Sequence, residues 1–256
     1  MPDRELTGRY AAWPAGAARA LLAALLALLI SAALVPIRAG EGDDVPPGVA
    51  STAAPRERDA DLVLYDHVIA RLRQGEGYYA VIAEEHRRHN YPLRPGFAVR
   101  LPTLAYAEAL LPPGALIPLS VALLGAVLLA WWRRLAEEPG GLPLRTLAMA
   151  ALFFGASIGT IRYFFVLHEV WAGQLLALSF ALHRPGQEPG RPGRWLAAWC
   201  AAAAALAIRE HALPFVLLMA AFAAWHRRWR EALAWALLAA LFCGGLAWHL
   251  HTVSGL

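Results

Sequence analysis

The sequence predicts an all-α integral membrane protein with about seven transmembrane helices and amphipathic surface helices in the first extracytoplasmic loop. Hydrophobic residues make up 59% of the 256 residues and charged residues only 16%, whereas an ordinary globular domain has about 25% charged residues. Long apolar stretches recur along the chain, with one polar segment near its start. The lipid bilayer is therefore expected to be the main solvent and a partner of the chain.

Seven apolar segments are candidates to cross the bilayer, where a full span requires about 20 residues. They are 17–37, 115–132, 146–165, 168–183, 195–208, 211–225 and 232–250. The fourth, fifth and sixth are short, which indicates tilted, re-entrant or paired segments. The first has the alternative of a cleaved signal peptide, although its apolar run exceeds the usual signal core. Residues 1–256 are thus expected to form a single membrane domain, with six membrane segments in 115–250.

The arginines predict the orientation of the chain, because short cytoplasmic loops are enriched in basic residues. One set of short loops contains Arg133, Arg134, Arg184, Arg191, Arg194, Arg227, Arg228 and Arg230. This places the amino terminus in the cytoplasm and 38–113 outside. Arginine as the sole basic residue, beside many Ala and Gly, is typical of a GC-rich bacterial gene. We therefore expect a multi-pass protein of the bacterial cytoplasmic (inner) membrane.

Several classes of site are excluded by the sequence. Cys200 and Cys243 lie inside apolar runs, which excludes a cysteine-based zinc site and argues against a structural disulfide. We find no glycine-rich nucleotide loop and no Ser–His–Asp spacing. The net charge of +4 follows from cytoplasmic arginines and requires no nucleic-acid partner. No cofactor is predicted, with a divalent metal as the alternative considered below.

The segment 38–113 is the polar insert. After a flexible start, Leu62, Tyr65, Ile69 and Leu72 recur at helical spacing, and Gly75 and Gly77 end this helix. A second helix is predicted over 78–89 and a third over 102–111, where a proline fits the first position. We expect these amphipathic helices to lie on the outer membrane surface.

The order of these elements and several short motifs resemble one known family. The motifs are "DLVLY" with Asp61 and Tyr65, "GEGYY", "YPLRPGFAVRLPTLAY", "HEVWAGQLLALSFAL" and "AIREHALPFVLL". Together with one span, a large outer loop and six further spans, this pattern resembles the membrane module of the glycosyltransferase C superfamily. Members usually carry more spans after the seventh, so the chain is expected to be a fragment or a minimal form.

This resemblance implies transfer of a sugar from a polyprenyl-phosphate donor to an acceptor at the outer face of the cytoplasmic membrane. The acceptor hydroxyl needs a general base, for which Asp61 is the first candidate and Asp59 the second. Tyr65 is the neighbouring candidate for substrate contact. The alternative for both aspartates is a structural role, because carboxylates are favourable at a helix amino terminus.

Cationic groups must also stabilise the departing lipid phosphate. Two ionic clusters at outer turns are candidates to bind the phosphate or the sugar, and Arg100 is a further one. The clusters are Arg162, His168 and Glu169, and Arg209, Glu210 and His211. Ionisable groups near hydrocarbon usually pair or line a polar cavity. The alternative is therefore internal pairing, Arg162 with Glu169 and Arg209 with Glu210.

The run "EEHRRH" contains a weak candidate for a metal site. On a predicted helix, His89 lies four residues after Glu85 and three residues after His86, and these spacings can hold a divalent metal. A solvated helix face has the same pattern without a metal.

Two other functions remain open. A transporter or flippase-like protein would use the ionic turns as a substrate path, although the halves show no inverted repeat. A truncated non-catalytic membrane scaffold is the third possibility. The sequence identifies neither the sugar nor the acceptor.

Overall fold

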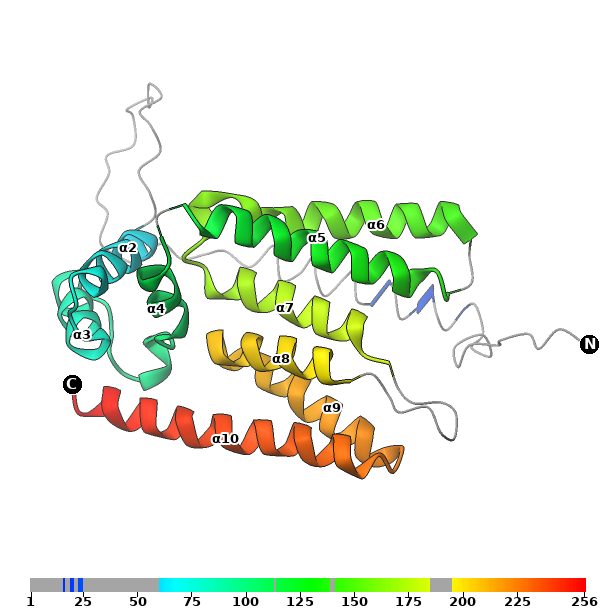
Figure 1. Ribbon diagram of the computed structural model, residues 1–256. Helices are drawn as coiled ribbons and strands as arrows, with labels where there is room; N and C mark the ends of the chain where they lie inside the picture. Colours follow the sequence, from blue (N-terminus) through cyan, green and yellow to red (C-terminus); the bar gives the residue numbers. More distant parts are fainter. Residues whose placement is uncertain are drawn as a thin grey trace, which may run out of the picture. The chain divides into compact units, whose positions relative to one another are not determined.

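The computed structural model describes residues 16, 19–20, 23–24, 60–112, 114–138, 141–184 and 195–256. The chain divides into two compact units, Met1–Arg56 and Glu57–Leu256. In the first unit the described residues are helical; the rest of the predicted segment 17–37 lies outside the described residues. In the second unit the elements are α- and 3₁₀-helices, with no β-strand among the described residues (Figure 1). The all-α class is confirmed for this part of the chain.

The polar insert folds into three α-helices and one 3₁₀-helix. They are α2 (Ala60–Arg73), α3 (Tyr78–Arg88), η1 (Gly96–Ala98) and α4 (Thr103–Leu110). These α-helices lie within a residue or two of the predicted positions. Their apolar stripes, however, are buried in a protein core and do not lie open to lipid. The core contains Leu62, Tyr65, Val68, Ile69, Leu72, Tyr78, Val81, Ile82, Val99, Val166 and Val253.

This core joins the insert to the helices that follow it. Val166 precedes α7 and Val253 lies near the end of α10, and both belong to the same buried cluster as side chains of α2 and α3. Complete burial of a large apolar side chain stabilises the fold by about 1.5–3 kcal/mol. The insert is therefore held to the helical bundle by burial of apolar surface.

The remaining helices form that bundle. They are α5 (Leu116–Leu135), α6 (Gly141–Ser157), η2 (Ile158–Thr160), η3 (Arg162–Phe164), α7 (His168–Leu182), α8 (Leu196–Ile208), η4 (Glu210–Ala212), α9 (Leu213–Trp225) and α10 (Trp229–Ser254). Along the bundle, α6 packs on α5, α5 on α7, and α7 on α8, while α9 packs on α10 (Figure 1).

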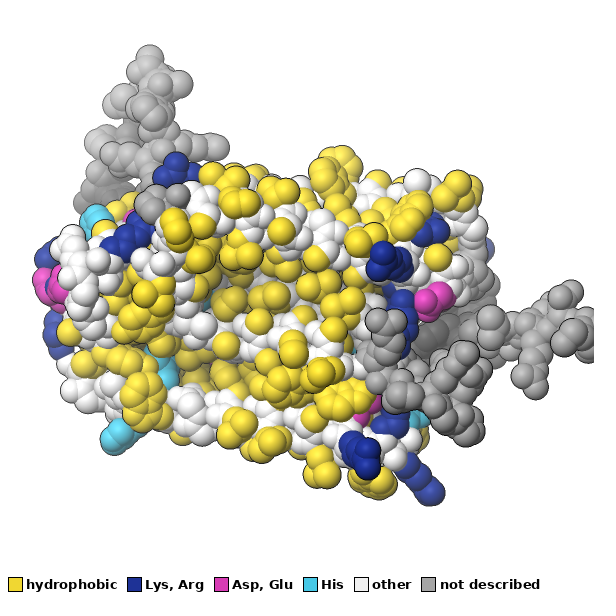
Figure 2. Space-filling model, viewed as in Figure 1, with side chains coloured by type: hydrophobic (Ala, Val, Ile, Leu, Met, Phe, Trp, Pro, Cys, Tyr) yellow, Lys and Arg dark blue, Asp and Glu magenta, His cyan; other side chains and the backbone are white. Residues whose placement is uncertain are grey.

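Three helical segments are long and apolar enough to cross a membrane: Leu116–Leu135, Gly141–Thr160 and Trp229–Ser254. The seven spans expected from the sequence are not confirmed. The apolar helix α8 has 13 residues and extends about 20 Å, less than the roughly 30 Å of a bilayer core. Large apolar side chains such as Leu147, Phe154 and Leu241 are exposed, and apolar side chains cover much of the visible face in Figure 2. Such a surface is typical of contact with lipid.

The turns between helices gather at two ends of the bundle. The start of α5, the α6–α7 turn, the α8–α9 turn and the end of α10 lie at the end occupied by α2–α4 (Figure 1). Arg133 and Arg134 end α5, and Arg228 and Arg230 adjoin the start of α10 at the opposite end. The two ionic clusters and the insert therefore share one end, as the sequence predicts.

Candidate functional site

Arg100, in the loop before α4, is the centre of the candidate site. Its Nη2 atom lies 3.7 Å from Oδ2 of Asp61 in the first turn of α2. Its guanidinium carbon lies 4.4 Å from the centre of the Tyr65 ring, which is a cation–π contact. Its Nη1 donates a hydrogen bond of 3.3 Å to the carbonyl of Val166. Arg100 thereby connects α2 with the segment that leads into α7.

The backbone of Arg100 is fixed by two tyrosines. Its N–H donates to the Tyr65 hydroxyl at 3.3 Å, and its carbonyl accepts a 2.6 Å hydrogen bond from the Tyr78 hydroxyl. Burial raises the pKa of the Tyr65 hydroxyl, against the opposing fields of Arg100 and Arg209. Burial likewise raises the pKa of Tyr78. Both phenols are therefore neutral hydrogen-bonding groups that position Arg100.

Asp61 is the accessible acid of this site. Its side chain is 49% exposed, whereas that of Arg100 is 14% exposed. Separation of 3.7 Å gives an ion pair without a short hydrogen bond, so the carboxylate keeps lone pairs free for another partner. The second predicted base, Asp59, lies outside the described residues.

His168 is buried and has a structural role. It is 2% exposed, and its two ring nitrogens lie 3.2 Å from the carbonyl oxygens of Val166 and Leu101. The edge of its ring meets Tyr65, with 5.8 Å between ring centres. His168 thus holds the start of α7 to the loop before α4, close to the site but covered by protein.

The second ionic cluster centres on Arg209, between α8 and η4. Its Nη2 lies 2.9 Å from a Glu169 oxygen at the start of α7, and its Nη1 lies 3.4 Å from a Glu210 oxygen. His211, with a 72% exposed side chain, lies 3.2 Å from the same Glu210 oxygen. Glu169 therefore pairs with Arg209, and not with Arg162 as the alternative from the sequence had it. The Nε atom of Arg209 is buried without a hydrogen-bond partner among the described residues.

Arg162 lies in a different place. It lines a cavity of about 540 Å³ between α2, α4, the start of α5 and η3. Polar side chains of α2 and α4 also line this cavity: Asp66, Arg73 and Glu108. Val166, whose carbonyl accepts the hydrogen bond from Arg100, also lines this cavity.

The structure supports two of the three metal-binding residues expected from the sequence and replaces the third. Nδ1 of His86 lies 3.0 Å from the Pro92 carbonyl oxygen, and the His86 ring packs against Tyr91. His86 is therefore directed to the following loop. Glu85 and His89 instead meet His67 of α2. The sequence analysis missed His67 because it lies on another helix.

A buried ionic group at the opposite end was also missed. Glu231 accepts from Nε2 of His183 at 2.7 Å and from Nη1 of Arg228 at 2.7 Å. His183 is 5% exposed and Glu231 3% exposed. The only sequence signal was a carboxylate and a histidine, each at the border of an apolar run.

The fold and the site define a protein that is helical in its described part, with three helices long and apolar enough to cross a membrane and an ionic site at one end of its bundle. No protein family, no curated protein and no solved structure matches the chain.

Proposed function

We propose that the chain binds a polyprenyl-phosphate-linked sugar at the outer membrane surface and transfers the sugar to an acceptor. The observation that carries this proposal is the grouping of Asp61, Arg100, Glu169 and Arg209 at one end of the bundle. An accessible carboxylate and two arginines are the groups that such a transfer requires. The resemblance to the glycosyltransferase C superfamily supports the same reaction.

Asp61 is assigned the role of general base. Its half-exposed carboxylate can reach an acceptor hydroxyl that arrives from water. Arg100 holds that carboxylate on one side and is itself fixed by Tyr65 and Tyr78. This arrangement orients the base before the acceptor binds, which lowers the entropy loss in the transition state.

Arg209 is assigned the role of phosphate ligand. Its guanidinium has a donor, Nε, without a partner among the described residues, and arginine binds phosphate through paired N–H donors. Glu169 and Glu210 occupy the other nitrogens. Because Nε is buried, a phosphate reaches this guanidinium by replacing the half-exposed Glu169 carboxylate.

A groove beside this cluster suits the polyprenyl tail. A cavity of about 380 Å³ lies between α6 and α7, with Glu169 among its lining residues. The other lining residues are mostly small or apolar: Ala151, Leu152, Gly155, Ala156, Ile158, Val170, Gly173, Gln174 and Ala177. A chain entering from lipid along this groove brings its phosphate to the Glu169–Arg209 pair.

Binding of farnesyl phosphate, with farnesol as the control for the tail alone, tests this proposal. The chain in lipid nanodiscs is expected to bind farnesyl phosphate at least tenfold more tightly. Arg209→Ala should remove that difference, whereas Arg230→Ala at the opposite end should keep it. Equal affinities of the wild-type chain for the two ligands would contradict the proposal. Movement of a polyprenyl-phosphate sugar across a liposome without sugar transfer would favour a transporter.

A further inference from the structure

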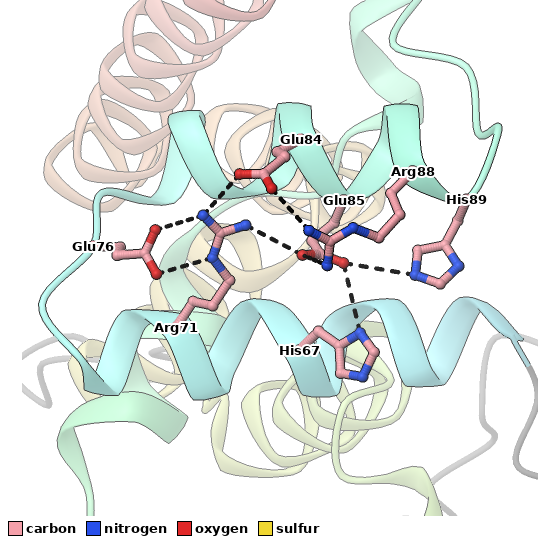
Figure 3. A network of polar contacts seen from close by, with 7 residues as sticks. All are labelled: His67, Arg71, Glu76, Glu84, Glu85, Arg88 and His89. Atoms are coloured by element: carbon pink, nitrogen blue, oxygen red, sulfur yellow. Dashed lines mark hydrogen bonds and ion pairs between the residues drawn. The ribbon is translucent and has the colours of Figure 1, made fainter.

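Helices α2 and α3 are joined by a polar network around a buried carboxylate, shown in Figure 3. Glu85 of α3 has no exposed side-chain surface. Its Oε1 atom lies 3.2 Å from Nη1 of Arg71 and 3.1 Å from Nη1 of Arg88. These two contacts satisfy one of the two carboxylate oxygens.

The other oxygen of Glu85 is in a different situation. Oε2 is buried without a hydrogen-bond partner, and so is Nε2 of His89. Oε2 lies 3.5 Å from Nδ1 of His67 and 3.6 Å from Nε2 of His89. Figure 3 shows both rings directed at this oxygen. Buried polar atoms without partners are rare in folded proteins, and a bound ion is one of the arrangements that would satisfy them.

The distances from Glu85 Oε2 to the two histidine nitrogens fit ligands of one tetrahedral metal ion better than direct hydrogen bonds. Charge-assisted hydrogen bonds between nitrogen and a carboxylate measure about 2.7–2.9 Å. Ligands about 2.0–2.2 Å from a tetrahedral zinc ion lie about 3.3–3.6 Å from one another. The two measured edges, 3.5 and 3.6 Å, agree with the second geometry. All three ligand atoms lie within 4.8 Å of one another.

The charges around the three residues also permit a cation. Arg71 pairs with Glu76 and Glu84, and Arg88 pairs with Glu84 as well as Glu85. Two guanidinium groups and three carboxylates give this network a net charge of −1 with neutral histidines (2 − 3 = −1). The arginines hold Oε1 and leave Oε2 for a metal as a monodentate ligand.

We propose that His67, Glu85 and His89 bind one divalent transition-metal ion of the zinc class and thereby tie α2 to α3. Two imidazole nitrogens and one carboxylate oxygen suit zinc, whereas magnesium and calcium prefer oxygen ligands alone. The side chains of His67 and His89 are 51% and 28% exposed, so the ion enters from water. Three protein ligands leave a fourth position open to solvent. This site is independent of the sugar-transfer proposal.

Metal titration of the purified chain tests this site. The chain, in detergent with a purification tag that contains no histidine, is stripped with chelator and titrated with Zn²⁺ by calorimetry and with Co²⁺ by absorption spectroscopy. We expect one strong site per chain and a visible spectrum of tetrahedral cobalt. His67→Gln and His89→Gln should each weaken binding by at least the 10–100-fold that loss of an outer-shell partner costs. His251→Gln, at an exposed histidine on α10, should leave the affinity unchanged.

The variants distinguish binding at this specific site from nonspecific binding of metal elsewhere on the chain. Because His67 and His89 are partly exposed, both variants are expected to fold, and circular dichroism checks this directly. Absence of a strong site in the wild-type chain overturns the proposal. Equal affinity of the wild-type, His67→Gln and His89→Gln chains overturns it as well.

Discussion

The Asp61 carboxylate lies 3.7 Å from the Arg100 guanidinium, which in turn packs on the Tyr65 ring at 4.4 Å. Asp61 is the more exposed partner of the pair, and the backbone of Arg100 is fixed by hydrogen bonds with Tyr65 and Tyr78. The arrangement therefore has a rigid cation and an accessible carboxylate, as a positioned general base requires.

The first prediction concerns Asp61→Asn. Asparagine keeps the size of the side chain but cannot accept the hydroxyl proton, so transfer from a radiolabelled polyprenyl-phosphate sugar should fall by about 10²–10⁴-fold. Binding of farnesyl phosphate should persist, because the proposed phosphate ligand is Arg209. The assay uses proteoliposomes with cell-envelope material as acceptor and protein amounts matched by immunoblot. Full transfer by the variant would remove Asp61 from the reaction.

The second prediction concerns Glu169→Gln. Glu169 pairs with Arg209 at 2.9 Å, and under the proposed function it competes with the lipid phosphate for this guanidinium. Removal of this charge should strengthen binding of farnesyl phosphate by several-fold, since a half-exposed ion pair contributes up to about 1 kcal/mol. Affinity for farnesol should not change. Weaker phosphate binding by Glu169→Gln would mean that Glu169 supports the site and does not compete with the ligand.

Local helix signals were readable from the sequence, whereas ionic partners were not. The period of Leu62, Tyr65, Ile69 and Leu72, with Gly75 after it, predicted α2 closely. The same stripe did not reveal whether protein or lipid covers it, because both environments select apolar residues. The structure buries this stripe against α3 and α4.

Ionic partners depend on which helices become neighbours. The alternative pairing of Arg209 with the adjacent Glu210 is present at 3.4 Å, but Arg209 makes a shorter contact of 2.9 Å with Glu169 on α7, which the sequence did not indicate. The helical spacing of His86 and His89 suggested a shared face, but Nδ1 of His86 lies 3.0 Å from the Pro92 carbonyl oxygen. The third member, His67, lies on α2. Such long-range contacts are set by tertiary packing, which short-range spacing does not encode.

The third prediction concerns membrane orientation. With Cys200 and Cys243 replaced by Ala, single cysteines are placed at Gln74 on the α2–α3 turn and at Glu138 after α5. Both positions are exposed, and they belong to opposite ends of the bundle in Figure 1. An impermeant thiol reagent should label Gln74→Cys in intact cells and Glu138→Cys only after lysis. The reverse pattern would place the Asp61–Arg100 site in the cytoplasm.

The fourth prediction compares a buried and an exposed ion pair. Glu231 is 3% exposed and pairs with Arg228 and His183, so Glu231→Ala should lower the free energy of unfolding by about 3–5 kcal/mol. Glu137 pairs with Arg184 at 3.0 Å but is 57% exposed, so Glu137→Ala should cost at most about 1 kcal/mol. Denaturant titration in detergent measures both. Equal losses would show that the Glu231 group is solvated in the folded protein.

The fifth prediction concerns the close approach of η2 to α7. A Cβ atom at Gly159 would overlap the side-chain amide of Gln174 and lie 3.1 Å from Cγ1 of Val170. Gln174 is 7% exposed and donates a 3.0 Å hydrogen bond to the Ala156 carbonyl. A displaced Gln174 amide would no longer donate to the Ala156 carbonyl, and buried polar groups would be left without a partner. Gly159→Ala should therefore destabilise the protein by about 1–3 kcal/mol.

Gly125 provides the matched control for Gly159. It lies inside α5, and an added Cβ there meets no atom within 4 Å. Gly125→Ala should therefore be neutral or stabilising by up to about 1 kcal/mol, the helix propensity difference between the two residues. A double variant, Gly159→Ala with Gln174→Ala, should be less destabilised than the sum of the single variants, because the smaller side chain at 174 leaves room for the new methyl group. Additive losses would show that the contact between Gly159 and Gln174 does not determine the stability of this turn.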